Sequence, residues 1–415
     1  MVTVRPFRGL RPRKDLAAKV AAPPYDVLSS EEAREMARDN PYSFLHVNKP
    51  EIDLEPGIDL YDPRVYQKGA ENLKRLIQQG VMFQDEEPRF YVYKQVMGSH
   101  EQIGLVACAS VEEYEKDIIK KHEHTRPEKE DDRVRHIDHL NAQVGPVFLT
   151  YRADEEIDRL ISEVIQHPPE YDFTSEDGVR HTFWVVSDPK WIQQIQAAFQ
   201  KVDALYVADG HHRSAAAMRV KQKRQAENPH HTGEEEYNYF LVVIFPHNQM
   251  QILDYNRVVK DLNGMDRETF LRRIQEKFDV EALPEGQRYK PRQPHTFGMY
   301  LQGRWYKLTA RPGTFDENDP VKRLDVSILQ ENLLGPVLGI QDPRKDKRID
   351  FVGGIRGLEE LERRVDSGEW ALAFALYPTS IEDLMAIADA GKVMPPKSTW
   401  FEPKLKSGLV VHLLD

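Results

Sequence analysis

Short apolar runs alternate with amphipathic helical stretches along the middle of the chain. Four runs rich in β-branched and aromatic side chains are typical of buried strands: residues 145–151, 181–186, 205–207 and 237–245. Between these runs, apolar residues recur at helical spacing in residues 154–166, from Asp188 onward, and from Arg213 to about Ala226. The alternation of strands and helices predicts an α/β layer arrangement.

The flanking regions carry a less regular pattern. Prolines keep most of residues 1–50 extended or turning, and apolar runs at 89–96 and 102–111 predict a hairpin around Gly98. The C-terminal third contains predicted helices at 267–278, 325–338, 357–365 and 381–390, a hairpin at 295–309 and a strand at 370–376. We expect three parts: an N-terminal α/β region at 1–115, a core at 116–260, and a C-terminal α/β region at 261–415 that packs back on the core.

The densest polar chemistry interrupts the central pattern directly after the strand at 205–207. A strand that enters a helix through a glycine turn leaves the first helical N–H groups unpaired, at the positive end of the helix dipole. Imidazole and guanidinium groups add donors suited to phosphate. The predicted phosphate-binding set is Gly210, His211, His212, Arg213 and Ser214. The carboxylate of Asp209 stands just before this set, where it could hold Mg²⁺ or take a proton.

A simpler interpretation of this stretch stays open. Asp209 could act only as the N-cap of the helix, and the histidines could be surface residues of its first turn. Turn chemistry alone explains most isolated Asp-Gly pairs. Here, however, five polar or glycine residues in a row separate an apolar strand from an alanine-rich helix, which favours a functional site.

A second polar stretch follows the predicted hairpin, at residues 119–133. His122, Glu123, His124 and Thr125 bring a carboxylate, two imidazoles and a hydroxyl together after an apolar strand pair, where loop-borne active residues tend to lie. An ordinary solvated loop explains the same charge run equally well. Metal binding by His122 and His124 is a further option, but no clear third ligand accompanies them.

Other candidates are scattered along the chain. Tyr25 and Asp26 lie in a proline-rich loop that either displays them or simply turns. Asn256 and Arg257 interrupt an apolar strand, and a solvated strand end explains them as well. The tail carries donors that could meet an oxyanion or only dock the tail: Lys397, Ser398, Thr399 and Lys404. Two histidines share a face of the helix predicted at 133–143 and are expected at the surface: His136 and His139.

Composition narrows the class of protein. The chain has 415 residues, of which 40% are hydrophobic, so it can bury a substantial core in two or three domains. Its net charge is −11, whereas proteins that rely on phosphate-backbone contacts usually carry a basic excess, so a nucleic-acid partner is not expected. The single cysteine, Cys108, excludes an internal disulfide framework and fits a reducing cytosol. The sequence leaves the oligomeric state open.

Targeting signals and the familiar nucleotide-binding signatures are absent from the sequence. The N-terminus has no apolar signal region and no window reaches the length of a membrane span, so we expect a cytoplasmic protein without a membrane partner. We find no Walker A loop, no GxGxxG, no HExxH and no paired CxxC. Any phosphate-binding site in this chain must therefore be built from a different sequence motif.

The turn at 209–213 resembles the phosphate-binding turn of the ParB/sulfiredoxin-like superfamily. Its two-histidine form is most similar to that of free serine kinases. The whole chain also resembles a large bacterial and archaeal family catalogued only as a domain of unknown function. That resemblance covers almost all 415 residues and rests on motifs at 23–27, 122–125, 208–213, 254–257 and 394–399. The implied fold is a ParB/sulfiredoxin-like α/β core with large N- and C-terminal additions.

The resemblance to free serine kinases implies a kinase of serine metabolism that phosphorylates the hydroxyl of free L-serine. Asp209 and the histidine pair would then handle the transferred phosphoryl group and its Mg²⁺, while Glu123 serves as base and His211 is able to move a proton. Further phosphate contacts are expected from Lys397 and Arg257, and substrate contacts from Tyr25, Asp26, His124, Thr125 and Asn256. The donor, whether ATP, ADP or pyrophosphate, is open.

Two other functions stay open at this point. One is a non-catalytic nucleotide-sensing or DNA-associated module, as in ParB, for which residues 220–224 form the only modest basic stretch. The other is a phosphatase that uses the same turn.

Overall fold

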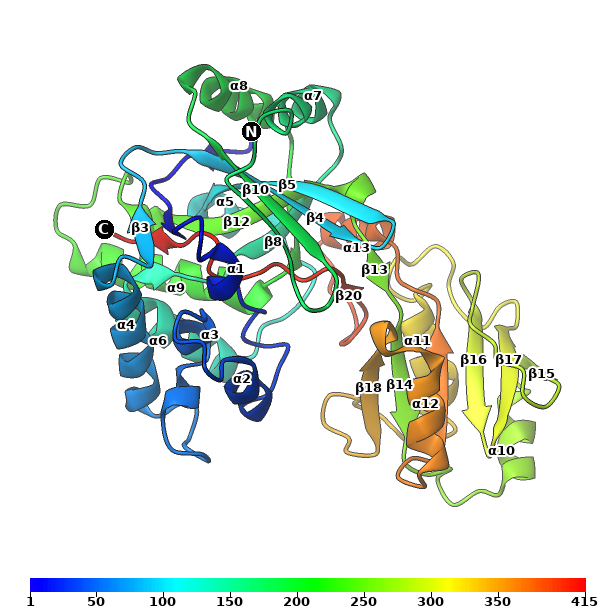
Figure 1. Ribbon diagram of the computed structural model, residues 1–415. Helices are drawn as coiled ribbons and strands as arrows, with labels where there is room; N and C mark the ends of the chain where they lie inside the picture. The colour runs from blue at the N-terminus through cyan, green and yellow to red at the C-terminus, as the bar shows by residue number, and fades with distance from the viewer. The chain divides into compact units, whose positions relative to one another are not determined.

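The computed structural model describes residues 1–415 and contains two compact units. Unit 1 comprises residues 1–250 and 403–415, and unit 2 comprises residues 251–402. Both units mix helices and strands, which confirms the predicted α/β class (Figure 1). The units do not coincide with the three parts expected from the sequence, because strands from 1–115 and from 116–260 share one sheet and the end of the chain belongs to unit 1.

Unit 1 is built on a 9-stranded mixed sheet in the order β6-β11-β8-β12-β5-β4-β10-β9, with β1 added to β5. The strands are β1 (Val4–Arg5), β4 (Phe90–Met97), β5 (His100–Ser110), β6 (Ile119–Lys120), β8 (Val147–Tyr151), β9 (Tyr171–Thr174), β10 (Arg180–Val186), β11 (Leu205–Asp209) and β12 (Tyr239–Pro246). The pairs β6–β11 and β8–β12 are parallel, whereas the other neighbours are antiparallel. The long apolar run of β12 is buried in the middle of the sheet.

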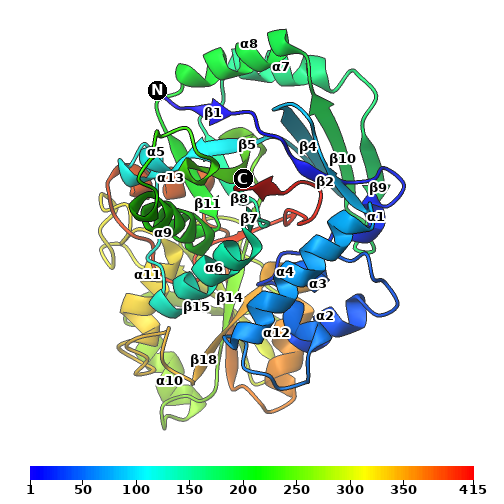
Figure 2. The same cartoon turned by 90° about the vertical axis from the view of Figure 1, so that its left-hand side faces the viewer.

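Helices cover both faces of this sheet. Two helices, α7 (Glu155–Val164) and α8 (Pro189–Gln200), lie on one face, and α6 (Pro127–Leu140) and α9 (His211–Glu227) lie on the other (Figures 1 and 2). The remaining helices of unit 1 are α1 (Ala17–Val20), α2 (Ser30–Met36), α3 (Leu45–Asn48), α4 (Pro63–Gln78) and α5 (Val111–Glu115). The carboxylates of Asp154 and Asp188 cap α7 and α8, which is why these helices begin where the sequence predicts.

The C-terminal segment completes unit 1. Strand β21 (His412–Leu413) pairs with β7 (Ala142–Gln143), while β2 (Leu10–Pro12) pairs with β3 (Met82–Gln84). Val411 is fully buried in a core cluster that also contains Leu10 and Leu45. Residues 403–415 are therefore part of the core of unit 1.

Unit 2 contains a 6-stranded antiparallel sheet in the order β15-β17-β16-β19-β14-β18. Its strands are β14 (Tyr255–Val259), β15 (Phe278–Ala282), β16 (Thr296–Leu301), β17 (Arg304–Ala310), β18 (Ile349–Gly353) and β19 (Leu372–Leu376), and its helices are α10 (Arg267–Ile274), α11 (Asp325–Leu329), α12 (Gly357–Asp366) and α13 (Ile381–Asp389). The predicted hairpin at 295–309 is confirmed as β16–β17. The helix predicted at 325–338 is shorter, because α11 passes into a π-helical turn at Gln330–Leu334.

Two short strands close unit 2 at its ends. Strand β13 (Ile252–Leu253) pairs antiparallel with β20 (Trp400–Phe401), so the chain enters and leaves unit 2 through adjacent strands. None of the helices of the protein is long and apolar enough to cross a membrane.

Candidate active site

Two parallel strands bring the polar stretches of the sequence together. Strand β6 pairs with β11 so that Ile119 lies opposite Leu205. Parallel strands end at the same edge of a sheet, so the loop after β6 and the turn after β11 leave the sheet side by side. The first loop carries Glu123 and the second carries His211, which places these two candidates at one edge of unit 1.

Gly210 makes the turn between β11 and α9. Its backbone has φ 106° and ψ 34°, a region that favours glycine, and it is itself the N-cap of α9 without any side-chain cap. The interpretation of Asp209 as a simple N-cap is therefore wrong. A Cβ atom at Gly210 would lie 3.3 Å from Nη2 of Arg213 and 3.3 Å from Cγ1 of Val147, so the turn is also tightly packed.

The two buried histidines of the site contact each other. The rings of His122 and His211 lie edge to face at 89°, with their centroids 4.4 Å apart. The backbone N–H of His122 donates to Nε2 of His211 at 3.4 Å, so we assign the proton of the His211 ring to Nδ1. Burial, reinforced by His122, lowers the pKa of His211 well below 6.5 and keeps its imidazole neutral.

His122 is a neutral imidazole with one nitrogen available. Burial lowers the pKa of His122 to about 4, against the opposing effects of the Val207 backbone and of Asp209. Its Nδ1 atom is buried and has no hydrogen-bond partner. A neutral imidazole whose nitrogen lone pair is unoccupied can accept a hydrogen bond or bind a metal ion.

Glu123 lies against the tip of α9. Its carboxylate Oε2 is 3.5 Å from Nδ1 of His211, and its side chain is half exposed. The ligand atoms of His122, Glu123 and His211 all lie within 4.8 Å of one another, so these three residues could hold a metal ion once the Nδ1 proton of His211 is released. His124, which the sequence paired with His122 as a metal ligand, is exposed and is not part of this cluster.

Asp209 is ionised and faces a lysine. Burial acts to raise the pKa of Asp209, but the positive charges of Lys404 and Arg213 outweigh it and leave the pKa below its usual range. The Nζ atom of Lys404 is 3.8 Å from the Asp209 carboxylate. An ionised, partly exposed carboxylate fits Mg²⁺, which uses one or two carboxylates and leaves its other positions to water and phosphate oxygens.

The remaining residues of the turn contact nearby backbone. Nε2 of His212 accepts from the N–H of Arg126 at 3.1 Å. The hydroxyl of Ser214 donates to the carbonyl of Gly210 at 2.9 Å and is buried, so it closes the first turn of α9. Arg213 donates from Nη1 to the carbonyl of Pro146 and lines a cavity in unit 1.

The substrate candidates of unit 1 have different surroundings. The ring of Tyr25 lies under the guanidinium of Arg133, 3.8 Å from ring centroid to Cζ. Asp26 is exposed, and the hydroxyl of Thr125 donates to the Glu130 carboxylate at 2.6 Å. Thr125 is therefore already hydrogen-bonded, whereas Tyr25 lines the same cavity as Arg213.

Three other candidates belong to unit 2. Asn256 and Arg257 are buried, which overturns the alternative of a solvated strand end. The guanidinium of Arg257 donates to the carbonyls of Tyr255 and Lys397, and burial lowers its pKa to about 10. Lys397 is exposed, with φ 57°. Whether these residues contribute to the turn of unit 1 stays a prediction.

His136 was expected at the surface, and this prediction is wrong. Helix α6 begins at Pro127, earlier than predicted, and its Ile137 packs with Ala216 and Val220 of α9. His136 is therefore buried, its Nε2 lies 3.0 Å from the carbonyl of Val47, and burial lowers its pKa to about 3. His139 is exposed, as expected.

The basic stretch of α9 is occupied by ion pairs. Lys221 lies 2.6 Å from Glu115, while Lys223 and Arg224 lie 2.5 Å and 3.1 Å from the two oxygens of Asp138. Positive charge neutralised in this way contributes little to attraction for a phosphate backbone. Each basic side chain of residues 220–224 therefore lies beside a carboxylate.

The chain belongs to a family described as "Protein of unknown function (DUF1015)", whose model matches residues 4–327. None of the curated proteins matches the chain. Among solved structures, a free serine kinase in complex with AMP is 14% identical, with 71% of this chain and 89% of that chain covered and a TM-score of 0.35. A conserved hypothetical protein from Pyrococcus furiosus is 15% identical (72% and 93% covered, TM-score 0.35), and SbnI with C-terminal truncation from Staphylococcus aureus is 12% identical (74% and 87% covered, TM-score 0.38).

Proposed function

We propose that this member of a family of unknown function is a phosphotransferase that transfers a phosphoryl group to the hydroxyl of free L-serine. The observation that carries the proposal is the Glu123 carboxylate beside the His211 imidazole at the tip of α9. Phosphoryl transfer depends on positioning and on stabilising negative charge rather than on covalent participation of the protein. A base, a neutral imidazole and a helix tip that attracts anions supply those requirements.

Glu123 acts as the general base in this mechanism. Its carboxylate accepts the proton of the serine hydroxyl as the new O–P bond forms and the bond from phosphorus to the leaving oxygen of the donor breaks. His211 is neutral and directs its Nδ1–H toward Glu123, so it orients the base. Partial exposure of Glu123 lets an acceptor hydroxyl reach it from solvent.

The tip of α9 binds the phosphoryl oxygens. The N–H groups that open a helix have no intrahelical partners and lie at the positive end of its dipole. His212 and Arg213 add side-chain donors there. Asp209 would hold Mg²⁺, which neutralises charge on the donor oxygens when bound. Lys404, 3.8 Å from the same carboxylate, adds a further positive charge.

The direct test is to incubate the purified chain with Mg²⁺, L-serine and, separately, ATP, ADP or pyrophosphate, and to follow O-phosphoserine by ³¹P NMR. Formation of O-phosphoserine with one donor supports the proposal and identifies the donor. If no O-phosphoserine forms with any of the three donors, the chain is not a serine kinase. If the chain instead releases inorganic phosphate from O-phosphoserine when no nucleotide or other phosphate acceptor is present, it is a phosphatase.

A further inference from the structure

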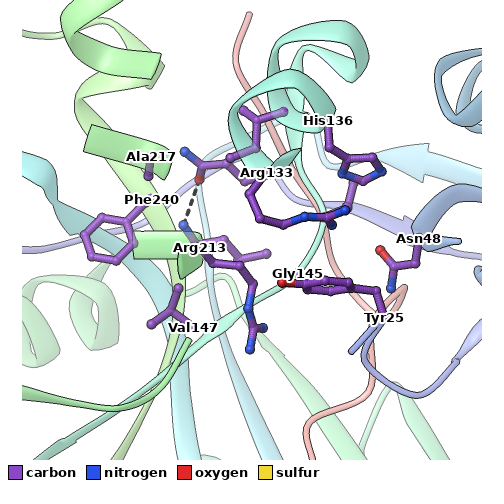
Figure 3. Close-up of a pocket in the computed structure, with 13 residues that line it drawn as sticks. Tyr25, Asn48, Arg133, His136, Gly145, Val147, Arg213, Ala217 and Phe240 are labelled. Carbon is purple, nitrogen blue, oxygen red and sulfur yellow. Dashed lines mark hydrogen bonds between the residues drawn. The ribbon is translucent and has the colours of Figure 1, made fainter. Parts of the chain in front are cut away.

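A small cavity lies in unit 1 beside the turn that opens α9 (Figure 3). Its volume is about 30 Å³, which is room for one or two water-sized groups. The polar side chains that matter for a ligand come from separate segments: Tyr25, Asn48, Arg133 and Arg213. No acidic residue lines the cavity, and part of its wall is apolar: Val147, Ala217 and Phe240.

Arg133 is a buried cation held in a fixed orientation. Only 8% of the residue is exposed, its guanidinium stacks on the Tyr25 ring, and it pairs with Asp132 at 2.8 Å. Stacking on one face and an ion pair on one edge restrict the rotation of the planar guanidinium. Arg133 therefore presents a preorganised fork of N–H donors to a neighbouring anion.

Asn48 supplies an unpaired donor in the same cavity. The residue is 3% exposed, and its Nδ2 has no hydrogen-bond partner. A buried amide without a partner is costly, so native proteins rarely keep one without a ligand or water to satisfy it. In Figure 3 its amide lies on the side of the cavity away from Phe240, together with Tyr25.

We propose that this cavity binds the carboxylate of the acceptor amino acid, an inference that rests on the proposed function. Arginine forks match the planar shape of a carboxylate and hold it through paired N–H donors. The carboxylate can also accept from the Nδ2 of Asn48, which satisfies that orphaned group. A phosphate needs donors around a tetrahedron, whereas the apolar wall leaves one side without donors.

The position of the cavity orients the acceptor. Arg213 lines the cavity and also contacts the turn, since its Nη2 lies 3.3 Å from the place of a Cβ at Gly210. A carboxylate bound between Arg133 and Arg213 therefore leaves the rest of the acceptor beside the tip of α9. The inferred acceptor class is a small α-amino acid with a hydroxyl, and alcohols without a carboxylate are excluded.

Isothermal titration of the 415-residue chain with L-serine and with L-serine amide tests this inference independently of catalysis. The wild type should bind L-serine and bind the amide at least about tenfold more weakly, because the amide lacks the charge that two guanidinium groups recognise. Asn48→Leu should weaken L-serine binding by about tenfold while the midpoint of thermal unfolding is maintained, because Nδ2 has no protein partner to lose. Arg133→Met should reduce the ratio of the affinity for L-serine to the affinity for L-serine amide below that of the wild type.

Asn332→Leu is the matched control. Asn332 is a buried amide of unit 2 whose Nδ2 donates to the carbonyls of Thr314 and Ile328, so this variant should lose stability and keep the affinity for L-serine. Unchanged L-serine affinity in Asn48→Leu and Arg133→Met would overturn the inference, even if O-phosphoserine forms normally. If inorganic phosphate binding is lost in these variants and serine binding is not, the cavity is a phosphate site and the inference is also overturned. If the cavity variants lose L-serine binding but the wild type forms no O-phosphoserine, the carboxylate site is supported and the kinase function is rejected.

Discussion

At the residue scale, the burial of His122 and His211 keeps both imidazoles of the site uncharged. Both rings are buried, which disfavours protonation of either, and the neighbouring His122 adds to this effect at His211. Glu123 therefore lies beside a neutral imidazole at neutral pH. Asp209 keeps its charge for a different reason, because Lys404 and Arg213 lie near it.

The depressed pKa of His122 predicts a pH dependence of stability. Unfolded His122 takes up a proton near pH 6.5, whereas folded His122 resists until about pH 4, so the unfolded state binds more protons in this window. The free energy of unfolding should fall by roughly 3 kcal/mol from this residue as pH drops from 6.5 to 4, and should lose nothing more from it below that. Urea denaturation of the wild type and of His122→Gln across this range measures the difference. Parallel curves for the two proteins would contradict the prediction.

Removal of the proposed base should act on catalysis rather than on binding. Glu123→Gln keeps the shape of the side chain and loses the charge that accepts the hydroxyl proton, so kcat for O-phosphoserine formation should fall by about 10²- to 10⁴-fold with little change in KM. Glu128→Gln, which changes an exposed carboxylate in the first turn of α6, serves as the control and should leave kcat unchanged. A rise in KM at constant kcat would show that Glu123 binds the substrate and is not the base.

At the element scale, the turn between β11 and α9 depends on a backbone conformation that only glycine adopts easily. Gly210→Ala and Gly233→Ala both place alanine at positive φ, at 106° and 96° respectively, and each should lose about 1 kcal/mol of stability. Only Gly210 has neighbours, Arg213 and Val147, within 3.3 Å of the new methyl group, whereas Gly233 has nothing within 4 Å. Pyrophosphate affinity, measured by isothermal titration, should therefore fall in Gly210→Ala alone. Equal pyrophosphate affinities in the two variants would show that the turn at Gly210 does not bind phosphate.

The same scale shows where local pattern predicts an element well. The capped starts of α7 and α8 and the hairpin β16–β17 follow from aspartate caps, a proline at the first helical position and a glycine turn. The start of α6 and the end of α11 were predicted less well. Charged residues in the first turn of α6 hide its amphipathic period, and the chain after Leu329 leaves the α-helical register.

At the scale of the whole molecule, the last residues of the chain stabilise unit 1. Val411 is fully buried beside Leu10 and Leu45, and its backbone pairs with that of Leu10. Val411→Ala should lower the free energy of unfolding by about 2 kcal/mol through lost burial and the cavity left behind. Val27→Ala removes the same atoms from a side chain that is 42% exposed and should change stability little. Similar losses in both variants, measured by urea denaturation, would contradict this role of the C-terminal segment.

Unit 2 is inserted into the chain of unit 1 between residues 250 and 403, and its first and last strands pair with each other. Because β13 and β20 are adjacent, a short Gly/Ser linker can replace residues 251–402 without stretching unit 1. The shortened chain should unfold cooperatively and bind L-serine with the affinity of the full chain, because every residue that lines the proposed carboxylate cavity belongs to unit 1. Its transferase rate then measures what residues 251–402 contribute as a whole. Loss of cooperative unfolding would show that unit 1 depends on unit 2.

The sequence by itself determined the features that depend on neighbours along the chain. The mixed α/β class, the glycine turn after β11 and the polar loop after β6 follow from apolar periodicity and turn chemistry. These signals are local, since a period of two or 3.6 residues and a positive φ are decided within a few positions. The candidate residues from Asp209 to Arg213 and Glu123 were therefore identifiable before the fold was known.

Only the tertiary structure decided which of these local features meet. The parallel pairing of β6 with β11 brings Glu123 to His211, the return of residues 403–415 brings Lys404 to Asp209, and the packing of α6 on α9 buries His136. Arg133 and Asn48 join one cavity from helices that carry no local sign of a shared site. Strand pairing and side-chain packing between distant segments gain their free energy from burial and hydrogen bonds across the whole unit, and no short window of sequence contains that information.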